Sequence, residues 1–245
     1  MQIINALLIS TIAGLSTVIG GLVIFFKIKN IDKFITFCLS FTAVIMIGIS
    51  VIELFPESFF TLSKNYSMFL TIIIILIFFV LGIFIIRLTN KLINNSDNLY
   101  KIGILNMIVL ILHNFPEGIT TFITSYHDLN IGISIAIAIM LHNIPEGVAI
   151  AVPIYCSTKS KKKALLKTFL SGISEPIGAL FAFIFIKNYI NDVLIAFLLI
   201  IVCTIMITLS LEKLLPEAIS RKSDKSLKMG FIMGIIVLFV SLFIL

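Results

Sequence analysis

Long runs of apolar residues, separated by short polar segments, extend along almost the whole chain. A helix needs about 20 apolar residues to cross the hydrocarbon of a bilayer. The runs do not alternate with the period of two that barrel strands show, so helices are predicted. We therefore expect an all-α, polytopic membrane protein with one transmembrane domain over residues 1–245. The eight expected spans are about 3–26, 34–55, 67–86, 102–122, 131–154, 168–187, 193–212 and 229–245.

Composition supports this interpretation and excludes other classes of protein. The chain is 60% hydrophobic and 12% charged, with a mean hydropathy of +1.20. Soluble domains carry about 25% charged residues, so a soluble fold and a disordered chain are both excluded. The net charge of +6 would suit nucleic acid, but the basic residues lie in short loops, so no nucleic-acid partner is expected. Cys38, Cys156 and Cys203 have no paired spacing, which predicts neither a disulfide nor a CxxC metal site.

The basic residues also predict an orientation. Sixteen Lys and Arg residues fall in the four loops that follow expected spans one, three, five and seven, against two in the other three loops. Basic loops stay in the cytoplasm, so both termini are expected outside. The first 26 residues carry no charge and lack the basic start of a signal peptide, which predicts a retained first span. The lysine-rich segment 159–167 is interpreted as part of this topological signal.

Acidic side chains lie within the apolar spans, where a charge is energetically unfavourable in a membrane protein. All seven glutamates fall inside or at the ends of apolar spans, whereas the five aspartates fall in loops or at their edges. A charged side chain at mid-bilayer costs at least about 2.5–3.5 kcal/mol, and such residues usually mark an ion or proton path. The glutamates therefore indicate transport. They are Glu53, Glu57, Glu117, Glu146, Glu175, Glu212 and Glu217.

The hexapeptide H-N-x-P-E-G occurs twice, starting at His113 and at His142. Within each copy His and Glu are four residues apart and share one helix face. Each His lies about 16 Å into its span, and the two spans are antiparallel, so both motifs should meet near the midplane. His113, Glu117, His142 and Glu146 would then offer nitrogen and oxygen ligands suited to zinc and other divalent first-row metals.

Proline follows the ligands in both hexapeptides. Pro116 and Pro145 cannot donate to the carbonyls of Leu112 and Leu141, so a local break or kink of each helix is expected. The glycines that end the motifs, Gly118 and Gly147, would let a neighbouring helix approach closely. In the sixth expected span, Glu175 again stands beside a proline and is expected to extend the site toward the cytoplasm.

Two segments outside the hexapeptides share the pattern M-x3-S-x5-P-E. One starts at Met46 in the second expected span and the other at Met206 in the seventh, and each contains a further Glu. These spans run in opposite directions, which predicts an inverted 3+2+3 arrangement, a transporter signature. Glu53 and Glu57 would line an outer mouth, and Glu212 and Glu217 an inner mouth, with interfacial helix-end residues as the alternative interpretation.

On these motifs the whole chain resembles the ZIP (Zrt/Irt-like) family of divalent metal transporters, and most closely its bacterial, GufA-like zinc-uptake members. The resemblance implies a binuclear metal centre between spans four, five and six. The first site would comprise His113, Glu117, His142 and Glu146, with a ligand from span two at or near Met46. The second site would comprise Asn114, Glu117, Asn143, Glu146 and Glu175. The resemblance also implies alternating access by sliding of one helix bundle against another.

Import of zinc, or of iron, manganese or cadmium, across the plasma membrane is the leading hypothesis, with metal as substrate and lipid as partner. A proton-coupled carrier of another solute is the alternative. An intramembrane metallohydrolase is disfavoured because H-E-x-x-H is absent, so no enzymatic activity is expected. His127, beside Asp128, is interpreted as a solvated loop residue, and the segment 87–101 has no His with which to capture metal. A homodimer, the degree of proton coupling and the choice between carrier and channel are left open.

Overall fold

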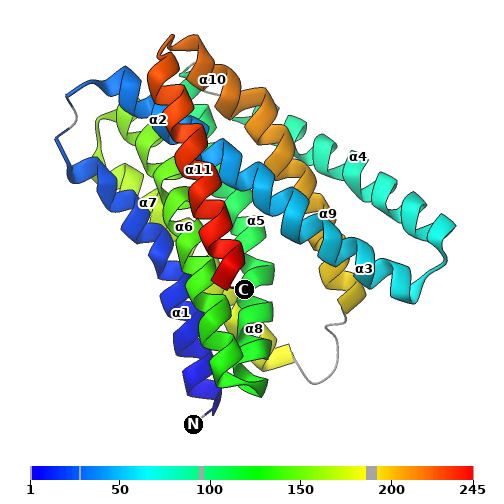
Figure 1. The fold of residues 1–245 in the computed structure, drawn as a ribbon. Coiled ribbons are helices and arrows are strands. Elements are labelled where there is room, and N and C mark those ends of the chain that lie inside the picture. The colour runs from blue at the N-terminus through cyan, green and yellow to red at the C-terminus, as the bar shows by residue number, and fades with distance from the viewer. Residues whose placement is uncertain (1, 28, 94–96, 186–191, 245) are drawn as a thin grey trace.

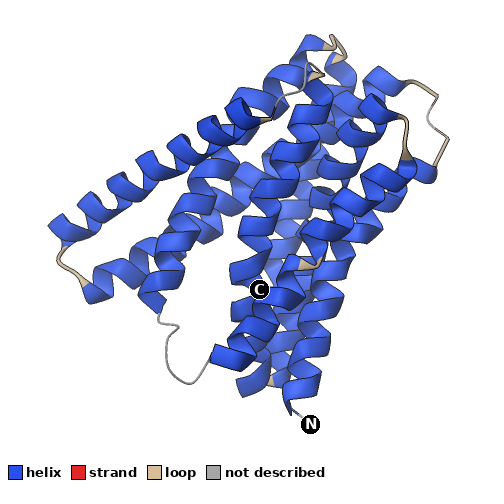
Figure 2. Cartoon of the chain, turned by 180° about the vertical axis from the view of Figure 1, so that it is seen from behind, coloured by secondary structure: helices blue, strands red, loops and turns tan. Residues whose placement is uncertain are grey.

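The computed structural model describes residues 2–27, 29–93, 97–185 and 192–244, and these form helices joined by short connections, with no strand among them (Figures 1 and 2). The elements are α1 (Gln2–Gly21), the 3-10 helix η1 (Leu22–Phe25), α2 (Ile31–Ile49), the π-helix η2 (Ser50–Leu54), α3 (Phe55–Asn65), α4 (Met68–Leu92), α5 (Asn98–His127), α6 (Leu129–Thr158), α7 (Lys161–Gly172), α8 (Ser174–Phe185), α9 (Asp192–Leu209), the π-helix η3 (Ser210–Leu214), α10 (Leu215–Ser220) and α11 (Asp224–Ile244).

Seven helical segments among the described residues are long and apolar enough to cross a membrane. They overlap the first seven expected spans and extend beyond most of them, although Phe26 and Ser67, expected at the ends of the first and third spans, lie just outside the observed segments. The eighth expected span, 229–245, lies in α11 and is not among the seven, so the number eight stays a prediction. The expected ends at residues 187 and 245 lie outside the described residues.

Polar side chains explain why several helices begin outside the apolar runs. The backbone N–H groups of the first turn have no hydrogen-bond partner within the helix. In each case the side chain of the residue before the helix accepts a hydrogen bond from one of these groups. These capping bonds let the helices extend past the apolar sequence. The capping residues are Asn30, Ser67, Asp97, Asp128 and Ser160.

The prolines of the hexapeptides do not end their helices. Pro116 lies inside α5 and Pro145 inside α6, so the expected break at these positions is wrong, whereas the expected kink stays a prediction. Both helices are packed on several sides, and these contacts hold the turn in which the proline lacks a donor. The sixth span is interrupted instead at Ile173, and Pro176 lies in the first turn of α8, where a missing N–H costs little.

The two M-x3-S-x5-P-E segments have the same local structure. Each becomes a π-helix at its serine, Ser50 in one copy and Ser210 in the other, and returns to an α-helix at the residue before the proline. A π-turn inserts one extra residue and is frequent at functional sites. The two copies run in opposite directions, because α2 descends toward α3 whereas α9 rises toward α10 (Figure 1).

Contacts divide the helices into two groups. Helices α1, α5, α6, α7 and α8 pack on one another and are called the site group. Helices α2, α3, α4, α9, α10 and α11 form the outer group. The two groups meet mainly where α6 contacts α2 and α11 and where α5 contacts α9.

Candidate metal centre

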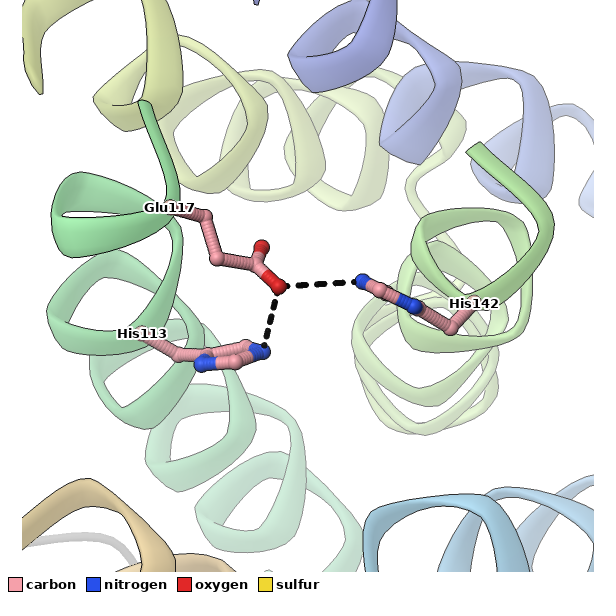
Figure 3. Close-up of side chains that lie close together, drawn as sticks. All are labelled: His113, Glu117 and His142. Atoms are coloured by element: carbon pink, nitrogen blue, oxygen red, sulfur yellow. Dashed lines mark hydrogen bonds and ion pairs between the residues drawn. The ribbon is translucent and has the colours of Figure 1, made fainter. Parts of the chain in front are cut away.

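The two hexapeptides meet inside the site group, at the contact between α5 and α6. His113 and Glu117 lie one turn apart on α5, and His142 faces them from α6 (Figure 3). All three residues are more than nine-tenths buried. Asp128 is the one residue between the helices, so this antiparallel pair brings equivalent turns of α5 and α6 to the same depth.

One carboxylate oxygen connects the two imidazoles. Glu117 Oε1 lies 3.2 Å from His113 Nε2 and 3.1 Å from His142 Nε2. Zinc bound tetrahedrally at about 2.1 Å from its ligands separates them by roughly 3.4 Å. The potential ligand atoms of these three residues lie within 4.8 Å of one another, so small side-chain movements would give this spacing. The arrangement is compatible with a metal site.

Glu146 and Glu175 extend the polar cluster beyond this trio. Glu146 Oε1 lies 4.0 Å from His113 Nε2, and Asn143 Nδ2 donates to Glu175 Oε2 at 2.9 Å. Both glutamates are fully buried. Asn114 is fully buried beside His113 on α5. The structure thus brings the motif residues of α5 and α6 together with Glu175 at the start of α8.

Several buried oxygen atoms of this cluster have no hydrogen-bond partner among the described residues. Leaving a buried polar atom unpaired costs about 1–3 kcal/mol, and more for a charged group. Such atoms in one small volume are the chemistry that a cation would satisfy. They are Asn114 Oδ1, Glu117 Oε2, Asn143 Oδ1, both carboxylate oxygens of Glu146, and Glu175 Oε1.

Met46 is also fully buried, within the main apolar core cluster on α2 of the outer group. Its neighbours in that cluster include Ile45 and Ile49, one residue before it and three residues after it. Its membership of this cluster places Met46 in apolar packing, and its role as a ligand stays a prediction.

A cavity of about 200 Å³ reaches the cluster. Glu53 and Glu57 from the outer group line it together with Glu117 and His142 from the site group. Beside it lies a second cavity of about 300 Å³, whose lining includes Asp192. The two cavities adjoin, because they share the lining residues Glu57, Thr120, Thr124 and Leu199. Asp192 is the first residue of α9, and this helix begins in the half of the molecule that carries the N-terminus (Figure 1). The two adjoining acidic cavities thus connect the start of α9 with the candidate metal centre.

Sequence reasoning did not single out Asp192. Asp192 directly precedes an apolar span, and this position could have marked it. On sequence alone it was grouped instead with the aspartates of the loops. The glutamates of the second repeat copy lie elsewhere. Glu212 is half exposed, 3.8 Å from Arg87, and Glu217 pairs with Arg221 near the opposite end. His127 is exposed, as expected, but it is the last residue of α5 and not a loop residue.

Glycines hold the cluster's helices in close contact. A Cβ atom on Gly118 would lie 1.9 Å from the carbonyl oxygen of Glu175, and one on Gly147 would lie 1.8 Å from that of Thr17. Both spacings are far below van der Waals contact, so only glycine fits. The expected close approach at these two positions is confirmed, and it brings α8 to α5 and α1 to α6.

Comparison with known proteins identifies the family of this chain. Residues 95–242 match the family described as ZIP Zinc transporter. The zinc transporter ZupT of Clostridium perfringens is 35% identical, over 98% of this chain and 96% of that protein. This chain belongs to the ZIP family. The zinc transporter ZupT of Streptococcus mutans is also 35% identical, over 98% of this chain and 97% of the relative, and that of Lysinibacillus sphaericus is 38% identical, over 95% and 94%.

Membership of the ZIP family makes the chain a multi-pass membrane protein, as its apolar helices indicate. The three relatives are named as transporters, which is a non-enzymatic class. The family therefore confirms the resemblance that the two hexapeptides indicated.

Proposed function

We propose that the protein imports a divalent transition metal into the cytoplasm across the plasma membrane, and that zinc is its main substrate. The observation that carries the proposal is the buried cluster in which Glu117 Oε1 lies about equally far from His113 Nε2 and His142 Nε2. Imidazole and carboxylate are the ligands that zinc and its first-row neighbours use. The zinc transporter names of the full-length relatives support zinc as the substrate.

The proposal includes two adjacent metal positions with bridging glutamates. The unpartnered oxygens of the cluster support the second position, because they would otherwise remain buried without a partner. The family resemblance alone adds Met46 to the first. The first position comprises His113, Glu117, His142, Glu146 and Met46. The second comprises Asn114, Glu117, Asn143, Glu146 and Glu175.

The orientation follows from the basic loops. Sixteen of the 18 Lys and Arg residues lie between alternate pairs of expected spans, in connections or helix ends that would be cytoplasmic. Both termini would then lie outside, and the acidic cavities would open outward. The matching π-helices in the two repeat copies support an inverted 3+2+3 arrangement of eight spans within one domain over residues 1–245.

In this proposal the metal enters through the acidic cavities and leaves past Glu217, whereas Glu212, half exposed beside Arg87, is an interfacial helix-end residue. A hydrated cation is attracted by Glu57 and Asp192, passes Glu53 and exchanges water for imidazole and carboxylate at the cluster. Carboxylates offset the cost of bringing a dication into a medium of low dielectric constant. Sliding of the site group against the outer group would then expose the cluster to the cytoplasm, and the metal would leave past Glu217.

Uptake into proteoliposomes tests the function. Purified protein is reconstituted with a zinc-sensitive dye inside, and zinc, iron, manganese and cadmium compete in a panel. We expect saturable zinc entry that protein-free liposomes do not show. Equal rates with and without protein would contradict transport, and uptake of another solute without metal would favour the proton-coupled alternative.

The second metal position makes a separate prediction about stoichiometry. Replacing Glu175 with Gln keeps the side-chain volume but removes a charge from that position only. We expect calorimetry on the purified protein to show two bound zinc ions for the natural sequence and one for the Glu175→Gln variant. Two ions in both proteins would contradict the ligand assignment of Glu175.

A further inference from the structure

Arg221 forms a compact ionic cluster at the end of the molecule opposite the acidic cavities. It follows α10, near the top in Figure 1, and its guanidinium donates to Glu217 Oε1 at 2.6 Å and to Asp32 Oδ1 at 2.5 Å. The other carboxylate oxygen of Glu217 accepts a hydrogen bond from Asn98 Nδ2. Both oxygens of Glu217 are therefore engaged.

The cluster joins the two helix groups. Asn98 begins α5 of the site group, whereas Glu217, Arg221 and Asp32 belong to or border helices of the outer group. The side chains of Arg221 and Glu217 are only 17% and 13% exposed, so water screens their attraction less than it screens a surface pair. Glu217 thus connects the start of α5 to the outer group.

The inverted repeat makes this contact informative. Glu57 and Glu217 occupy the same position in the two M-x3-S-x5-P-E copies. Glu57 lines an open cavity that leads to the metal centre, whereas Glu217 is covered by a guanidinium from its own helix end. Of the two equivalent glutamates, Glu57 therefore faces a cavity, whereas the charge of Glu217 is paired with that of Arg221.

We infer that the guanidinium of Arg221 closes the cytoplasmic exit by pairing with the carboxylate of Glu217. The departing divalent metal competes with this guanidinium for the carboxylate. The inference rests on the proposed function, in which metal leaves past Glu217. When the site group moves, Asn98 is withdrawn from Glu217 and the guanidinium loses part of its support. A dication arriving at Glu217 then displaces the guanidinium, which retains Asp32 as a partner.

Cys156 is a native probe for this contact. It is 8% exposed, and the next residue, Ser157, donates to Asp97 beside Asn98. With Cys38 and Cys203 replaced by Ala, Cys156 is the only cysteine of the chain. Its reaction with a membrane-impermeant maleimide, added to inverted membrane vesicles, reports access from the cytoplasmic side.

In this background the Arg221→Ala variant should react about tenfold faster at Cys156, because hydrogen bonds between charged groups have been lost. Arg221→Lys should restore part of the slow rate, because the positive charge remains. Arg87→Ala is the matched control, since it removes an exposed pair with Glu212, and it should react like the parent.

A second single-cysteine background separates opening of the exit from unfolding. Cys203 is buried in α9, where its thiol donates to the carbonyl of Ser50. Arg221→Ala should leave the reaction of Cys203 slow. Equal rates at Cys156 in parent and variant, or an equal acceleration at Cys203, would overturn the inference. Zinc uptake by the parent is measured in parallel, so a failure of transport and a failure of the exit contact are distinct results.

Discussion

Replacing Glu117 with Gln should lower zinc uptake by about 100-fold or more. One oxygen of Glu117 lies 3.1–3.2 Å from both imidazoles, so the variant loses the shared anionic ligand of the cluster. Gln keeps the size of the side chain, and packing around it is therefore retained. The measurement is the initial rate of zinc entry into proteoliposomes, with circular dichroism of the same samples to check the helical content.

Glu212→Gln is the control for loss of a carboxylate in the same chain. Glu212 is half exposed, lies beside Arg87 and does not line either acidic cavity. We expect its variant to transport zinc within about twofold of the natural rate. Uptake that is unchanged in the Glu117→Gln protein, or in a Glu117→Ala, Glu146→Ala double variant, would remove the basis for the proposed centre.

Replacing Gly20 with Ala should lower the free energy of unfolding by about 2–3 kcal/mol. A Cβ atom at this position would lie 1.9 Å from the carbonyl oxygen of Ile144 and 3.1 Å from the backbone nitrogen of Val148. Backbone atoms cannot rotate away, so α1 and α6 would have to separate. Thermal unfolding of the protein in detergent measures the effect.

The next residue supplies a closely matched control. A Cβ atom on Gly21 would meet side-chain atoms of Thr168 and Leu165 at 3.1–3.3 Å, and these side chains are able to shift by a few tenths of an ångström. Ala also favours the helix by up to about 1 kcal/mol relative to Gly. We expect Gly21→Ala to change stability by less than about 1 kcal/mol. Equal losses at both positions would contradict the close backbone contact.

The long apolar runs predicted the class of fold well, because the physics of a bilayer leaves few alternatives. Uninterrupted apolar runs of about 20 residues have to be helices, since the hydrocarbon offers no partner for backbone polar groups. The first seven expected spans correspond to seven observed helical segments. Their ends were harder to predict, because they depend on capping side chains such as Asn30 and Asp97, which lie outside the apolar runs.

The departures from helical regularity were not predicted, because tertiary packing decides them. Proline alone favoured breaks at Pro116 and Pro145, yet α5 and α6 continue through both. The π-helices at Ser50 and Ser210 lie just upstream of Pro56 and Pro216, and no local propensity marks them. The backbone hydrogen bonds of a π-helix join residues five apart, whereas those of an α-helix join residues four apart. Tertiary packing, which the sequence does not show, decides where the π-helical pattern is favourable.

The convergence of the motif residues was predictable because His113 and His142 stand at similar depths in antiparallel neighbours. The structure brings both to Glu117, and the ligand roles remain a proposal. The pairing of Arg221 with Asp32 joins residues 189 positions apart, and no motif marks it. Contacts of this kind depend on how helices distant in sequence are arranged, which periodicity does not specify.

The single-residue link at Asp128 has a consequence for the order of folding. His113, Glu117 and His142 all belong to one helical hairpin, α5–α6, so the heart of the cluster needs contacts between residues no more than about 30 positions apart. Short loops close quickly and at low entropic cost. We expect this hairpin to assemble as soon as its second helix has left the ribosome. Helix α1, made much earlier, would then dock against a preformed surface.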